Sequence, residues 1–132
     1  MLVIREAQLD SLGEVRREGF VRKTLAFLEQ HLPERHASFK GPRALATLEW
    51  VLKRGRALGL RSEQQLFKFA SLAAVYGPVF GATPETRWMN DYLTDARVPE
   101  PHQRFHRLYE EVLRRRRVEQ ANREALARFE RG

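Results

Sequence analysis

The sequence predicts an all-α protein, a single compact bundle of about five helices with a long arginine-rich C-terminal helix. Apolar residues recur at the spacing of helical faces, and proline, glycine and capping residues divide the chain into helix-length segments. No segment alternates apolar and polar residues over the length of a strand, so we expect no sheet. The chain has 132 residues, which is the size of one domain.

The first predicted helix spans residues 6–32, where a broad apolar arc is followed by Pro33. Proline lacks the amide hydrogen that another helical turn requires, so we expect the helix to end there. Residues 33–42 have the composition of a loop, and residues 1–4 form a short apolar lead-in.

The second and third helices are expected over residues 42–58 and 63–76. Gly59 suits the left-handed conformation that ends a helix, and Ser62 with Gln65 forms a capping box for the next one. Apolar residues cover nearly the whole circumference of the third helix. We therefore expect it to be the most enclosed element of the bundle.

Two further helices complete the predicted bundle. Thr83 and Pro84 open a short helix, and Pro101 opens the last one. The residues expected to face inward are Trp88, Met89, Tyr92, Leu93, Phe105, Leu108, Tyr109, Val112 and Leu113. We assign residues 1–113 to the helical bundle domain and residues 114–132 to an arginine-rich C-terminal helical extension.

The extension carries a second apolar face, turned away from the inner side of the same helix. The residues on this face are Val118, Asn122, Ala125 and Phe129. One straight helix cannot place both faces in one core, so either the helix bends or ends near Arg114, or the second face is left for another surface. The extension is then a solvated tail or an amphipathic docking helix for a partner.

Trp50 departs from the pattern of its helix, because it falls on the charged side. That side also carries Arg43, Glu49, Lys53 and Arg54. Tryptophan is enriched where proteins meet and often contributes much of the binding free energy. The alternative is that the loop at residues 34–41 folds over the ring.

The residue types exclude several kinds of chemistry. The chain has no cysteine, so it forms no disulfide and no thiolate site. His102, His106 and Glu110 share one row of a helix, but a zinc site needs further ligands, so we interpret them as surface residues. No Ser-His-acid motif or glycine-rich phosphate loop is present. We predict a non-enzymatic protein with no catalytic residue, metal, cofactor or small-molecule substrate.

The charge balance favours an acidic partner. Lysine and arginine number 24 against 17 acidic residues, a net charge of +7, and +4 of it lies in residues 114–132. Nucleic acid is a less favoured partner, because the helix at residues 63–76 is apolar where a helix-turn-helix presents polar, base-reading side chains. No uncharged apolar stretch approaches the roughly 20 residues of a membrane span, and no secretory signal opens the chain. We expect a cytoplasmic protein.

Several short motifs resemble a known group of proteins. They are I-R-x-x-Q-x-x-x-L at Ile4, Arg5, Gln8 and Leu12, G-L-x-S-E at Gly59, Leu60, Ser62 and Glu63, Y-G-x-x-F at Tyr76, Gly77 and Phe80, P-x-x-x-W at Pro84 and Trp88, L-x-D at Leu93 and Asp95, and R-L-Y at Arg107, Leu108 and Tyr109. Together they resemble a group of small all-helical accessory proteins of proteobacterial type VI secretion gene clusters. These proteins are encoded near PAAR spike-tip proteins, VgrG proteins and toxic effectors.

The resemblance implies an adaptor or co-chaperone that helps to load an effector onto the secretion spike. Its partner is then the effector, the effector's chaperone, or a PAAR or VgrG spike component. The residues expected to bind that partner are Trp50, Arg114, Arg115, Arg116, Arg117, Val118, Asn122, Ala125 and Phe129. The rival interpretations are an immunity protein that neutralises a cognate toxin and a basic protein that associates with nucleic acid.

Overall fold

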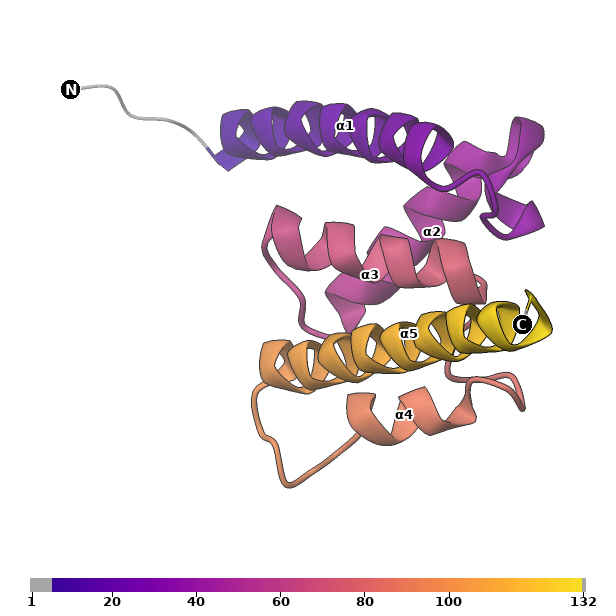
Figure 1. Cartoon of the computed structure of the whole chain (residues 1–132). Helices are drawn as coiled ribbons and strands as arrows, with labels where there is room; N and C mark the ends of the chain where they lie inside the picture. The colour runs from indigo at the N-terminus through magenta and orange to yellow at the C-terminus, as the bar shows by residue number, and fades with distance from the viewer. Residues whose placement is uncertain (1–5, 132) are drawn as a thin grey trace. The chain divides into compact units, whose positions relative to one another are not determined.

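The computed structural model describes residues 6–131, with side chains from Arg17 onward. These residues form helices and turns without any strand, as the sequence predicts (Figure 1). The helices are α1 (Glu6–His31), α2 (Ala44–Ala57), α3 (Glu63–Tyr76), α4 (Arg87–Leu93) and α5 (Pro101–Arg131), with short 3-10 turns η1 (Ala37–Phe39) and η2 (Gly41–Arg43). The apolar lead-in at residues 1–4 and the side chains of the first resembling motif lie outside the described part.

The contacts within the chain group it into two units, Met1–Phe80 and Gly81–Gly132. The first unit holds α1, α2 and α3, and the second holds α4 and α5. The boundary expected between residues 113 and 114 falls inside α5, which continues through it as one helix.

The core of the first unit forms where α2 packs on α3 and α1 covers both. As expected, α3 is the most enclosed helix, and its buried residues are Leu66, Phe69, Ala70, Leu72, Ala73 and Ala74. α2 contributes one apolar face, with Leu48, Val51 and Leu52 fully buried. Burying such side chains contributes roughly 1.5–3 kcal/mol each.

The helix caps predicted for the first unit are present. The Ser62 hydroxyl accepts the amide of Gln65 at 3.1 Å, while the Gln65 side chain accepts the amide of Ser62 at 3.3 Å. Gly59 and Gly77 have φ angles of +98° and +102°, which side chains with a Cβ rarely adopt, so helices end at both places.

The connection between α1 and α2 was predicted to be an irregular loop, but part of it is helical. It forms η1 and η2, and Phe39 of η1 is fully buried. The His36 amide donates to the carbonyl of Ala74 at 2.6 Å, which ties the loop to α3. α2 therefore begins at Ala44, two residues after the predicted start, because Pro42 lies in the preceding 3-10 turn.

The second unit is built by α4 lying alongside α5. Its buried apolar side chains are Met89, Leu93, Phe105, Leu108 and Val112. Leu113 was expected to face inward, but it is 40% exposed because it lies on the rim of the buried stripe. α4 begins at Arg87, later than predicted, because the buried Thr86 hydroxyl accepts the Gly81 amide at 2.9 Å and closes a turn first.

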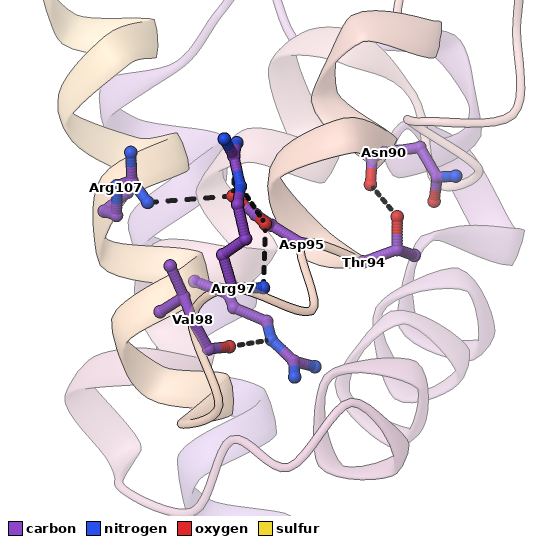
Figure 2. A network of polar contacts seen from close by, with 7 residues as sticks. Asn90, Thr94, Asp95, Arg97, Val98 and Arg107 are labelled. Carbon is purple, nitrogen blue, oxygen red and sulfur yellow. Dashed lines mark hydrogen bonds and ion pairs between the residues drawn. The ribbon is translucent and has the colours of Figure 1, made fainter.

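A polar network holds the connection from α4 to α5, as Figure 2 shows. Asp95 accepts hydrogen bonds from the Arg97 side chain at 3.0 and 3.2 Å, and Arg107 of α5 lies 3.7 Å from its carboxylate. The Arg97 guanidinium lowers the pKa of Asp95. Arg104 donates to the carbonyl of Val98 at 2.5 Å, so both ends of the loop are fixed to the start of α5.

Helices α2 and α3 approach each other closely at Gly55. A Cβ at Gly55 would lie 3.0 Å from Leu66 Cδ2 and 3.1 Å from Phe69 Cδ1, whereas one at Gly19 of α1 would meet nothing within 4 Å. We expect Gly55→Ala to lower the free energy of unfolding by about 1 kcal/mol, since overpacking outweighs the gain in helix propensity. The matched Gly19→Ala should raise it by about 0.5–1 kcal/mol. Urea unfolding followed by circular dichroism measures both, and equal effects would contradict the close packing.

Candidate protein-binding surfaces

α5 exposes the second apolar face along its C-terminal half. Val118 is 48% exposed and Phe129 is 81% exposed, and Asn122 and Ala125 are exposed as well. α5 does not end near Arg114, and the face continues in helical register to the last turns. Leu126 also lies on this half of the helix, is 56% exposed, and was missed by sequence analysis because it stands apart from the chosen stripe.

The arginine run does not face solvent uniformly, because Arg114 and Arg115 have partners within the second unit. Arg114 contacts the carboxylate of Glu111 with two nitrogens, at 2.9 and 2.5 Å, and Arg115 contacts it at 3.0 Å. The Arg115 guanidinium also stacks 3.5 Å from the centre of the Trp88 ring. Both arginines thus pair with Glu111 within α5, and Arg115 also joins α5 to α4 through Trp88. Their hydrogen bonds to the carboxylate lower the pKa of Glu111 to about 2.

Arg116 and Arg117 differ from their neighbours. Both are exposed, and neither forms an ion pair or a hydrogen bond with the residues that the structure describes. With Leu113, they border a shallow hollow along the helix, together with Gln120, Ala121 and Glu124. Two unpaired cations thus stand beside exposed apolar side chains, which is the arrangement that suits an acidic, partly apolar partner.

Trp50 lies on the outer side of α2 and is 49% exposed. The loop at residues 34–41, which was expected in the alternative interpretation to fold over the ring, leaves it half uncovered. A shallow hollow of about 530 Å³ surrounds it, and its lining residues are Arg43, Ala46, Thr47, Trp50, Pro78 and Val79. This second surface is made entirely by the first unit.

Arg54 corrects the expectation of a uniformly charged outer face on α2. It is half-buried, donates to the carbonyls of Pro78 and Phe80 at 3.0 and 2.6 Å, and lies 4.6 Å from the centre of the Phe80 ring. Burial lowers the pKa of its guanidinium. The sequence gives no sign of this contact, because the two carbonyls belong to a loop more than twenty residues away.

The histidines of α5 lie on the surface. His106 contacts Glu110 at 3.0 Å and His102 lies 4.0 Å from Glu100, with all four side chains at least half exposed. Among residues 17–131, no group of three His, Cys, Asp or Glu side chains could hold a metal ion. In the part of the chain that the structure describes, no helix has the length and apolar character needed to cross a bilayer.

Comparison with known proteins adds no relative. No family model, no curated protein and no solved structure matches the chain.

The Glu111 carboxylate gives the second unit a distinct response to acid. Its pKa falls from the ordinary 4.5 to about 2 when the chain folds, so its stabilising effect is complete above pH 4.5 and is lost as the pH falls towards 2. We expect the thermal midpoint of the wild type to fall over this interval more steeply than that of Glu111→Gln. Circular dichroism melts from pH 7 to 2 measure the difference, and Glu110→Gln on the neighbouring position is the control. Parallel curves for all three proteins would show that the Arg114 and Arg115 contacts contribute nothing.

Proposed function

We propose that this chain is a non-enzymatic adaptor or co-chaperone of type VI secretion. It binds an effector, the effector's chaperone, or a PAAR or VgrG spike component, and it assists effector loading. One observation carries the proposal: α5 stays helical beyond its last buried residue, Val112, and exposes an apolar face flanked by unpaired arginines. The motifs that resemble accessory proteins of these gene clusters supply the biological setting.

The geometry suggests how such a helix works. Val118 and Phe129 would be removed from water by a partner. Burial of the more exposed Phe129 would contribute roughly 1.5–3 kcal/mol before the costs of association, and the half-covered Val118 would contribute less. Arg116 and Arg117 would favour an acidic surface, which raises the rate of encounter and rejects basic surfaces. The same contact would cover apolar surface on the partner until export, which is what a co-chaperone does.

Co-expression with the products of the neighbouring genes tests the proposal. We expect affinity capture of the chain to retain at least one of them, and we expect Val118→Asp with Phe129→Ser to reduce its recovery more than tenfold. Arg116→Gln with Arg117→Gln should reduce recovery several-fold at low salt. The double variant Arg61→Gln and Arg87→Gln removes the same charge from exposed positions elsewhere and should have no effect.

Three outcomes would count against this function. Capture of none of the neighbouring products would remove the adaptor role. Protection of cells from a toxin encoded beside the chain, without any effect on loading, would favour an immunity protein. Retention of DNA or RNA that disappears between low and moderate salt would favour nucleic-acid association through the arginines.

Amide hydrogen exchange of the free chain and of the captured complex gives an independent prediction. In the free chain we expect residues 118–129 to exchange faster than residues 105–112, because their side chains lie exposed on the helix. In the complex, exchange at residues 118–129 should slow by at least about tenfold, since the partner covers the apolar face. Unchanged exchange in this segment upon complex formation would exclude it as the docking helix.

A further inference from the structure

The hollow around Trp50 has the features of a preformed ligand site. Arg54 anchors the carbonyls of Pro78 and Phe80, and the Phe80 ring is fully buried. Val79 lies between these two anchored residues, so its 45% exposed side chain is held at the rim of the hollow. The wall opposite Trp50 is therefore fixed by the core, which lowers the entropy lost when a ligand binds.

Small side chains form the floor of the hollow. Ala46 and Thr47 of α2 precede Trp50 by about one helical turn, and they let a ligand approach the helix closely. The indole ring on one side and Pro78 with Val79 on the other then offer apolar contacts to a large side chain. The hollow is shallow and open, which suits an extended segment better than an enclosed small molecule.

The charge at this site points to an acidic ligand. Arg43, the last residue of η2, precedes Trp50 by seven residues and lines the hollow. It makes no ion pair or hydrogen bond with any described residue. The Trp50 indole N–H likewise has no hydrogen-bond acceptor among residues 17–131. Arg43 thus brings an unpaired positive charge to a hollow whose other lining residues carry no charge. The nearest acidic side chain in sequence, Glu49, is turned about 100° around the helix and does not line it.

We propose that this hollow binds an extended acidic peptide segment, in which one large apolar side chain packs between Trp50 and Val79 and an adjacent Asp or Glu pairs with Arg43. The inference rests on the proposed function in one respect, namely that the ligand is protein. It goes further because it assigns a second surface, on the first unit and separate from α5, with its own ligand chemistry. The chain could then hold two segments at once, as an adaptor must.

A displayed peptide library tests this directly on the full chain. Random twelve-residue peptides on phage are selected on the wild-type protein and, in parallel, on Trp50→Ala. We expect the wild type alone to enrich peptides that carry a large apolar residue next to Asp or Glu. Absence of any enrichment over Trp50→Ala, or enrichment of peptides without an acidic residue, would overturn the proposal.

Variants of the hollow then locate the binding of one recovered peptide. In an NMR titration, its addition should shift the Trp50 indole N–H and the Val79 amide. Trp50→Ala should weaken binding at least about tenfold and Arg43→Gln about threefold. Lys53→Gln removes the same charge from an exposed position of α2 outside the hollow and should change the affinity less than twofold. Equal effects of Arg43→Gln and Lys53→Gln would contradict a carboxylate at Arg43.

Two further measurements keep the result unambiguous. Val79→Ser removes an exposed side chain from the opposite rim, so it should weaken the peptide several-fold even if Trp50→Ala unfolds the chain. Phe129→Ser on α5 should leave peptide affinity unchanged, whereas it should reduce capture of the secretion partner. Loss of peptide binding in Phe129→Ser would place the peptide on α5 instead. A DNA or RNA oligonucleotide that shifts the Trp50 and Val79 signals as strongly as the peptide would refute the assignment.

Discussion

The second unit depends on one helix being much longer than the helix that supports it. α5 has 31 residues and α4 has seven, so at 1.5 Å per residue they extend roughly 46 Å and 10 Å. The buried residues of α5 end at Val112, although the helix continues to Arg131. The remaining turns depend on local side-chain pairs, such as Gln120 with Glu124 at 3.0 Å. A helix extended in this way presents apolar side chains to solvent in a fixed register.

The arginine run performs two different tasks according to position. Glu111 and the Trp88 ring engage Arg114 and Arg115, and these contacts brace α5 just beyond the last core residue. Arg116 and Arg117 have no such partners among the described residues and keep their charge available. In the sequence the four consecutive arginines cannot be told apart. Helical geometry places only Arg114 and Arg115 within reach of the Glu111 carboxylate.

α2 shows how one helix can serve the core and a surface together. Leu48, Val51 and Leu52 are buried, while Trp50 stays half exposed. Arg54 lies between these two sides, and its stem and guanidinium fix the loop that follows α3. The hollow at Trp50 therefore depends on a long-range contact that links α2 to the loop after α3.

The sequence by itself determined the helical class, the capping box at Ser62 and the limits of α3, because helix periodicity and caps depend on neighbours within a few residues. It also identified Trp50 and the apolar face at residues 118–129 as departures from a simple core pattern. Only the tertiary structure decided that Phe39 completes the core, that Leu113 is exposed, and that Arg54 and Arg115 are engaged by an aromatic ring. Each of these depends on contacts between elements distant in sequence, and local spacing carries no information about them.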